Sequence, residues 1–270
     1  METLQIGNTT KQVPSTWNEM RRQQLLPILA ELYAPERPGR RLRLLALLTG
    51  FPLPLLGTQP VVVLAQLLPL TDFLFSEEHL LTAQLLPTLR VLGRRWRRQS
   101  TWHGPREYLR NLLFGEFMFA DTFFVLYSQH HQVEHLDKFL TVLYRPAQPE
   151  LDVNHPDWKG DVRVRFNEHQ LDARTPRVAR VPAIEKLAVL TWYRGCRAQL
   201  AQECPDVFTA AESIQEEEAQ QAPDWSRVLR KLSGGAFGTL QQTAEQPLHL
   251  ILAEMQDAAE DYNRLQNQAR

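Results

Sequence analysis

The chain has 270 residues, of which 43% are hydrophobic and 23% charged, and its formal net charge is −1. This composition excludes an intrinsically disordered chain and a small disulfide-stabilised fold, and the near-zero charge excludes a strong overall preference for nucleic acid or anionic membrane. Leu occurs 43 times against 21 for Val and Ile together, which favours helices over strands. The length suits one large domain or two modest ones.

The first segment predicts a small hairpin followed by a helix. Residues 3–13 contain two extended stretches around a Gly-Asn turn dipeptide, the pattern of a β-hairpin. Thr16 and Glu19 have the spacing of a capping box, so a helix is expected from there to about Leu32. The segment lacks a basic stretch followed by an apolar one, and no secretory signal is therefore expected.

The 27 residues from Leu44 to Leu70 carry no charge, whereas a membrane helix needs about 20 apolar residues. Prolines at positions 52, 54, 60 and 69 interrupt the stretch. An irregular backbone facing lipid would leave its polar groups unsatisfied, so we expect no membrane segment. The prediction is instead two short buried helices joined by a turn, 40–49 ending before Gly50 and 61–68 entered through Pro60.

The middle of the chain predicts three further helices. One is expected after Ser76 and reaches about Leu92, where an Arg-rich stretch follows. The next opens at Gly104-Pro105 and continues to Tyr127, and the third covers 133–144. Five phenylalanines between positions 114 and 124 mark the second of these helices as the centre of the core.

The composition changes beyond Pro146, where prolines, aspartates and arginines predominate. Residues 146–181 predict an irregular insertion in which only 161–166 alternates like a strand. A helix is expected from Pro182 to about Glu203. Residues 209–223 are acidic and rich in Gln and Ala, which is typical of a solvated linker.

The C-terminal segment predicts two helices. Asp224 has the position of a cap for a short helix that Gly234-Gly235 ends. Thr243 and Gln246 have capping-box spacing in front of a last helix that reaches about residue 268.

These elements together predict a mainly α fold. We expect an irregular multi-helix bundle with a small N-terminal β-hairpin and a short β element near 161–166. The expected organisation is a helical main domain over 1–208, an acidic linker over 209–223 and a C-terminal helical segment over 224–270. Cys196 and Cys204 lie about 12 Å apart along a helix axis, too far for a disulfide, so they are expected to be reduced thiols in a cytosolic protein.

Charge is distributed unevenly along the chain. Residues 1–110 hold 14 Lys and Arg against 8 Asp and Glu, a net charge of +6, which leaves residues 111–270 with −7. The two halves therefore either attract each other or face different partners.

One stretch matches a catalytic motif. His131, Glu134 and His135 form the H-x-x-E-H pattern, in which two histidines on one helical face hold zinc and the glutamate activates bound water. No third ligand can be assigned, and polar residues are expected at a helix entrance in any case. The favoured interpretation is a solvated corner between helices, and a zinc hydrolase is the alternative. No other catalytic pattern is found in the sequence, so we expect neither an enzyme nor a cofactor.

A second candidate site is basic. Its residues are Arg90, Arg94, Arg95, Arg97 and Arg98 around Trp96, with Arg106 and Arg110 beyond and Arg37, Arg40, Arg41 and Arg43 earlier in the chain. Arginine pairs with phosphates and an indole stacks on bases, so nucleic-acid binding is one interpretation. The favoured one is a solvated helix end that faces the acidic half of the chain or an acidic protein partner.

The order of several segments resembles a known family. The segments are Val13-Pro-Ser-Thr-Trp-Asn-Glu-Met20, Leu44-Leu-Ala-Leu-Leu-Thr-Gly-Phe-Pro52, Gly115-Glu-Phe-Met-Phe-Ala-Asp121 and Phe139-Leu-Thr-Val-Leu-Tyr-Arg-Pro146. The first two, with the Leu-rich run that follows to Phe75, look like segments of the tail-assembly chaperones and related tail proteins of tailed bacteriophages and prophages. The later two, with Trp225 to Met255, look like longer versions of such prophage-encoded proteins. The likeness covers most of residues 12–208, and the chain departs from the compact chaperones by its length, its insertion and its C-terminal segment.

The resemblance implies a non-enzymatic helical protein in the cytoplasm of a bacterial host. Such a protein binds the long helical tape-measure protein, or the tail-tube protein, and keeps the former soluble until tube subunits polymerise around it. Recognition of a helix in a groove would be the physical mode. The arginine and tryptophan residues at 94–98, together with the last helix, are the expected contacts.

Overall fold

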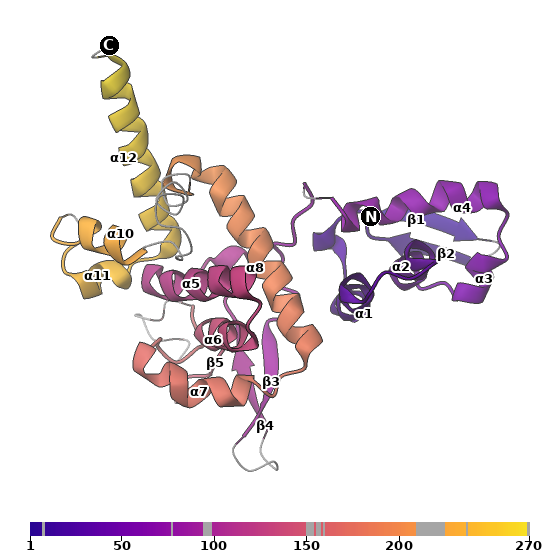
Figure 1. Ribbon diagram of the computed structural model, residues 1–270, viewed down its shortest axis with the longest axis horizontal. Coiled ribbons are helices and arrows are strands. Elements are labelled where there is room, and N and C mark those ends of the chain that lie inside the picture. The colour runs from indigo at the N-terminus through magenta and orange to yellow at the C-terminus, as the bar shows by residue number, and fades with distance from the viewer. Residues whose placement is uncertain are drawn as a thin grey trace. The chain divides into compact units, whose positions relative to one another are not determined.

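The mainly α fold is confirmed (Figure 1). The computed structural model describes residues 1–6, 9–76, 78–93, 99–149, 154, 158, 160–208, 225–235 and 237–268. Within these residues the chain forms helices and two small antiparallel sheets. It divides into two compact units: unit 1 comprises Met1–Leu86 with Ala183–Cys196, and unit 2 comprises Pro87–Pro182 with Arg197–Arg270.

Unit 1 begins with the predicted hairpin. Strands β1 (Glu2–Ile6) and β2 (Thr9–Val13) pair antiparallel in a register that joins the first residue of one to the last of the other. The capping box expected at Thr16 is wrong, because the Thr16 side chain caps nothing and only a 3-10 turn, η1 (Trp17–Glu19), follows. Glu19 instead accepts hydrogen bonds from the Ser15 amide and hydroxyl, and the helix itself starts later.

The remaining N-terminal elements of unit 1 are short. They are α1 (Arg22–Tyr33), α2 (Arg40–Thr49), α3 (Leu53–Gly57), α4 (Val61–Leu67) and η2 (Leu68–Leu74). Gly50 ends α2 in the left-handed conformation, with φ of 65°, and Pro60 precedes α4, both as predicted. Leu45, Phe51, Leu56 and Leu67 form an apolar core between these helices. The expectation that both predicted helices are buried is wrong for α4, because Val61 and Val62 are exposed.

A distant helix completes unit 1. Helix α8 (Ala183–Glu203) starts after Pro182 as predicted, and its first part belongs to this unit. The Trp192 indole donates a hydrogen bond to the Thr82 carbonyl at 3.0 Å. Gly195 lies so close to the Leu81 backbone that a Cβ atom there would clash with the Leu81 carbonyl. The segment that contains Leu81 and Thr82 is therefore held in place by close packing of its backbone against α8.

Unit 2 contains a three-stranded sheet that the sequence did not predict. Its strands are β3 (Thr88–Leu92), β4 (Gln99–His103) and β5 (Arg145–Pro146), in that order. The helix predicted to reach Leu92 is wrong: Leu89 and Val91 alternate with outward residues and are buried, and β4 pairs antiparallel with β3. Whether so short a segment forms a strand depends on its pairing with another strand, and the local sequence pattern does not reveal that partner.

Helices surround this sheet. They are η3 (Glu107–Leu109), α5 (Phe114–His130), α6 (Val133–Leu143), η4 (Glu168–Gln170), α7 (Leu171–Val178) and the end of α8. Helix α5 starts nine residues later than the Pro105 start that the sequence predicted. The insertion expected to be irregular contains α7, and its expected strand is reduced to one bridge between Ala147 and Arg163.

The C-terminal segment packs on the rest of unit 2. It forms α10 (Trp225–Leu232), α11 (Leu240–Ala244) and α12 (Leu248–Gln268), while the predicted linker over 209–223 and the cap at Asp224 lie outside the described residues. The buried Trp225 ring contacts Phe117 with centroids 5.1 Å apart, and the Leu248 amide donates to the Leu112 carbonyl. The predicted cap at Thr243 is wrong, because Thr239 forms the capping box, at the start of α11.

Candidate functional site

The five predicted contact residues, Arg94 to Arg98, lie outside the described residues. In the chain they connect β3 to β4, whose facing ends pair Leu92 with Gln99. The structure therefore describes the two strands that flank this stretch. The sequence predicts a helix that ends near Leu92, whereas the structure has the paired strands β3 and β4 on either side of the arginine-rich stretch.

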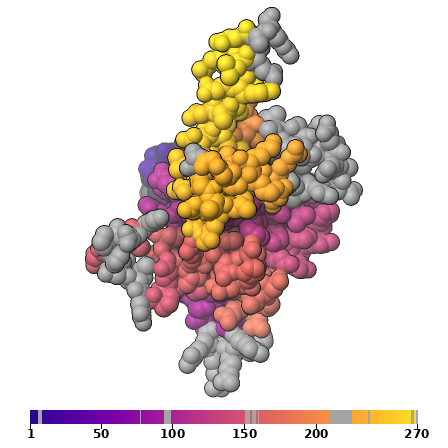
Figure 2. All heavy atoms as spheres, turned by 90° about the vertical axis from the view of Figure 1, so that its left-hand side faces the viewer, coloured from indigo at the N-terminus to yellow at the C-terminus, as the bar shows by residue number. Residues whose placement is uncertain are grey.

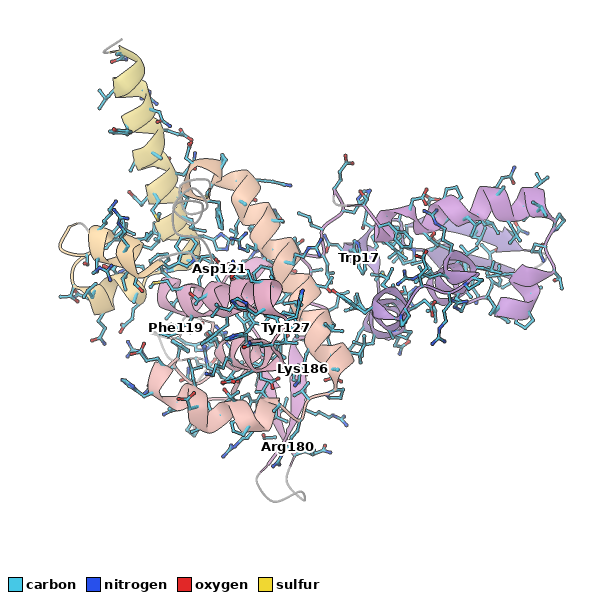
Figure 3. All side chains as sticks on the ribbon, viewed as in Figure 1. Trp17, Phe119, Asp121, Tyr127, Arg180 and Lys186 are labelled. Atoms are coloured by element: carbon cyan, nitrogen blue, oxygen red, sulfur yellow. The ribbon has the colours of Figure 1, made fainter. Side chains whose placement is uncertain are left out.

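Further arginines lie beside these strands. Arg90 is exposed on β3, and Arg180, just after α7, donates from Nη1 to the Gly93 carbonyl at 3.2 Å (Figure 3). Arg177 on α7 is also exposed. Burial and the neighbouring Arg177 guanidinium lower the pKa of Arg174. The sequence predicts Arg90 as part of the basic candidate site, but not Arg174, Arg177 and Arg180, because helix α7 was not expected. The described residues thus form a basic surface next to the arginine-rich connection.

The H-x-x-E-H residues do not share a helical face. Helix α5 ends at His130, His131 follows in the left-handed conformation with φ of 53°, and α6 starts at Val133. The Glu134 carboxylate pairs with Lys138 at 3.0 Å, and this hydrogen bond lowers the pKa of Glu134. Over the described ranges no group of three His, Cys, Asp or Glu side chains is placed to hold a metal ion. The turn between the two helices thus separates the histidines that the motif would combine.

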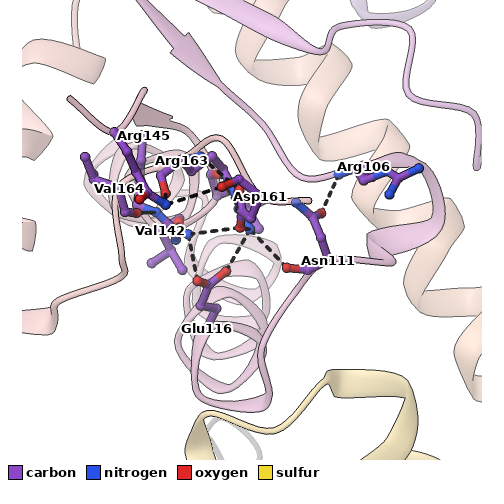
Figure 4. Close-up of polar contacts among 10 residues, drawn as sticks. Arg106, Asn111, Glu116, Val142, Arg145, Asp161, Arg163 and Val164 are labelled. Carbon is purple, nitrogen blue, oxygen red and sulfur yellow. Dashed lines mark hydrogen bonds and ion pairs between the residues drawn. The ribbon is translucent and has the colours of Figure 1, made fainter. Parts of the chain in front are cut away.

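A buried ion network lies at the centre of unit 2 (Figure 4). Glu116 on α5 accepts from Arg145 Nη2 at 2.6 Å and from Arg163 Nη2 at 3.1 Å. Arg163 also forms a two-pronged contact with Asp161, with Nη2 2.7 Å and Nε 2.9 Å from the two carboxylate oxygens. The side chains of Glu116 and both arginines are at most 3% exposed.

The backbone satisfies the remaining donors of this network. Arg145 donates to the carbonyls of Val142 and Val164, and Arg163 to the carbonyl of Leu143. Burial lowers the pKa of Arg145, and Glu116 offsets part of that effect. Two guanidiniums and two carboxylates balance in charge, and their bonds are internal. The network joins α5, the end of α6 and the 146–181 segment, so its role is to hold unit 2 together.

Asp121 forms a second buried polar contact on the same helix (Figure 3). Its side chain is fully buried, and it accepts from Arg197 Nε at 2.7 Å and from the Trp225 indole at 2.9 Å. These bonds join α5 to α8 and α10. Glu116 and Asp121 are the two acidic residues of the segment 115–121 that carries part of the family resemblance. Both serve packing in this fold.

An uncovered apolar surface lies on unit 1. Leu53 and Leu55 on α3 are 41% and 40% exposed, and Val61 and Val62 on α4 are 82% and 70% exposed. Leu56 and Leu67 on the same helices point into the core. This part of the chain contains no charged residue, and its exposed polar side chains are those of Thr58 and Gln66. Clustered exposed apolar side chains mark binding surfaces.

The described helices include none that is both long and apolar enough to cross a membrane. Comparisons with protein-family models, with curated proteins and with solved structures found no match. The function is therefore inferred from the surfaces of the molecule and from the resemblance of its segments.

Proposed function

We propose that the protein is a non-enzymatic binding protein of phage tail assembly, which holds a long helical tape-measure partner in a soluble form. The observation that carries the proposal is the exposure of four apolar side chains on α3 and α4, those of Leu53, Leu55, Val61 and Val62, which we take to form one binding surface. Burying such side chains against a partner releases roughly 25 cal/mol for each Å² of apolar surface removed from water. An amphipathic helix, presented by a tape-measure protein, offers the matching apolar stripe.

The internal polar groups support a binding role. Glu116, Asp121 and their arginine partners are engaged in contacts that join elements of unit 2. Glu134 is paired with a lysine of its own helix, and His131 lies outside that helix, which speaks against the zinc hydrolase. The apolar surface on unit 1 is thus the feature that calls for an external partner.

Co-expression with a long helical tape-measure protein of a tailed phage or prophage tests the proposal. The wild-type chain is expected to raise the soluble yield of that protein and to copurify with it. The double variant Val61→Ser with Val62→Ser is expected to lower copurification by at least about tenfold, the effect of losing roughly 1.4 kcal/mol at a binding hot spot.

Val133→Ser is the matched control, because Val133 is 60% exposed on α6 of the other unit. It should leave copurification unchanged. Equal loss in both variants, or no capture by the wild-type chain, contradicts the proposal. The same assay with the tail-tube protein tells the two candidate partners apart.

The basic surface around Arg90, Arg177 and Arg180 favours a second candidate function, nucleic-acid binding. Arginine side chains from two elements would pair with phosphates, and binding would weaken steeply with salt. A mobility shift of DNA or RNA at low salt that Arg177→Gln with Arg180→Gln reduces would support it. Absence of any shift at low salt would reject it.

A further inference from the structure

Helix α12 carries a regular apolar stripe along its whole length. Its positions alternate in steps of three and four residues, which is the heptad spacing of coiled-coil helices. The stripe consists of Leu248, Ile251, Met255, Ala258, Tyr262 and Leu265. A helix with this spacing presents one continuous seam to a neighbouring helix.

Unit 2 covers only the first part of the stripe. Leu248 and Ile251 are fully buried, whereas Tyr262 and Leu265 are 62% and 66% exposed. Ala258, between them, is also exposed. In Figures 1 and 2 the C-terminal turns of α12 extend beyond α10 and α11. From Ala258 onward about 15 Å of helix therefore continues the seam past the surface that buries it.

The exposed part of α12 is acidic. Four carboxylates and one guanidinium lie between Glu254 and Arg264, which gives this stretch a net charge of −3. Asp261 pairs with Arg264 at 3.3 Å, so the charge surplus lies mainly on Glu254, Asp257 and Glu260. In heptad positions Glu254 and Asp261 border the seam directly, where charges decide which partner is accepted.

We propose that the C-terminal half of α12 binds a basic amphipathic helix of a partner protein, in coiled-coil fashion. The buried half of α12 holds the exposed half in a fixed direction. Tyr262, Ala258 and Leu265 supply the apolar seam, and the acidic residues beside it select Lys or Arg on the partner. The proposal rests on the proposed function only in taking the partner to be a helical protein, and it uses a surface of the other unit.

Charge decides against the nearer alternatives. A second copy of α12 would set two stretches of net charge −3 against each other. The segment 209–223 of the same chain carries four glutamates and no Lys or Arg, so it too is acidic. A basic helix instead gains both the apolar contact and the charge complement.

A designed probe helix tests the proposal on the full chain. The probe is a four-heptad peptide with Leu at the a and d positions and Lys at e and g, and its counterpart has Glu at e and g. We expect the full chain to bind the Lys probe, measured by fluorescence anisotropy, at least about tenfold more tightly than the Glu probe. Ala258→Asp should weaken binding of the Lys probe by at least about tenfold, because it places a charge in the seam.

Ala253→Asp is the matched control, since it adds the same charge to an exposed position on another face of α12. It should leave the affinity for the Lys probe within about twofold of the wild-type value. Glu254→Lys with Asp261→Lys should reverse the preference in favour of the Glu probe. Equal effects of the two Asp variants, equal binding of both probes, or no binding at all would overturn the proposal.

Sedimentation of the full chain tests whether a second copy of the chain occupies the seam. A concentration-dependent dimer that Ala258→Asp abolishes would assign the seam to a second copy and overturn the choice of a basic partner. The apolar surface of unit 1 provides the distinction from the proposed function: Val61→Ser with Val62→Ser should leave probe binding unchanged. If the probe binds but tape-measure capture fails, only the proposed function is lost. If capture persists without probe binding, only this inference is lost.

Discussion

Glu116 connects three segments of unit 2 through one buried carboxylate. Its two oxygens face Arg145, which follows α6, and Arg163, which lies in the segment before α7. Burying charges of this kind is costly, and only mutual pairing with well-placed hydrogen bonds offsets the cost. Removing the negative charge leaves two buried guanidiniums with Asp161 as the remaining carboxylate. The expected effect is therefore a loss of stability of the fold.

Glu116→Gln is expected to lower the free energy of unfolding by about 3 kcal/mol, because it uncouples two buried cations from their shared anion. Urea unfolding of the full chain measures this, with an unchanged slope showing that the variant and the wild-type chain unfold in the same way. Glu107→Gln is the control, since Glu107 pairs with Arg110 at the surface, where both side chains are more than half exposed. A loss below about 1 kcal/mol is expected there. Equal losses would mean that the buried network contributes no more than a surface pair.

Sequence patterns identify residues whose role is local. Gly50 was predicted to end α2 because a left-handed residue there suits glycine, and the structure has that conformation. The partners of Glu116 could not be predicted, because Arg145 and Arg163 are 29 and 47 residues away and no spacing rule joins them. Arg145 and Arg163 resemble ordinary surface arginines in the sequence, and only the fold buries them.

At the scale of elements, helices with strong end signals were predicted closely. Pro182 and Pro60 begin α8 and α4 where expected, since proline suits the start of a helix. The strand β3 was missed because its Leu-rich sequence also fits a helix, and its pairing with β4 is a tertiary choice. The arginines that α7 adds to the basic surface were also missed, because no helix was expected in that proline-containing segment.

Gly195 in α8 marks a place where element packing depends on the absence of a side chain. Gly195→Ala would drive a Cβ atom into the Leu81 backbone, which has no rotamer with which to yield. We expect a loss of about 1–3 kcal/mol in the free energy of unfolding, measured by urea denaturation. Gly57→Ala, at the end of α3, is the control: a Cβ there meets nothing within 4 Å. It should be neutral or stabilise by about 0.4–1 kcal/mol. A neutral Gly195→Ala would show that the Leu81 segment moves freely.

For the whole molecule, chain order and compact units do not coincide. Unit 1 is completed by Ala183–Cys196, a part of α8 that follows most of unit 2 in the chain. No sequence pattern indicates that α8 is divided between the two units, because the residues after Pro182 predict one uninterrupted helix. Long-range contacts such as that of Trp192 with Thr82 decide the division, and a single sequence does not encode them in a local pattern.

Separate cores predict separate opening of the two units under native conditions. Trp192→Ala removes a buried ring and its hydrogen bond from unit 1, so backbone amides of α1 and α2 should lose hydrogen-exchange protection while those of α6 keep it. Phe117→Ala should do the reverse, because Phe117 is fully buried in unit 2 against Trp225 and Phe208. Hydrogen exchange followed by mass spectrometry measures the protection of peptides from both units in the same experiment. The two variants are compared under conditions where they lose the same amount of stability. If either variant lowers protection equally in α2 and α6, the chain opens as a single cooperative unit, and the division into two cores has no energetic counterpart.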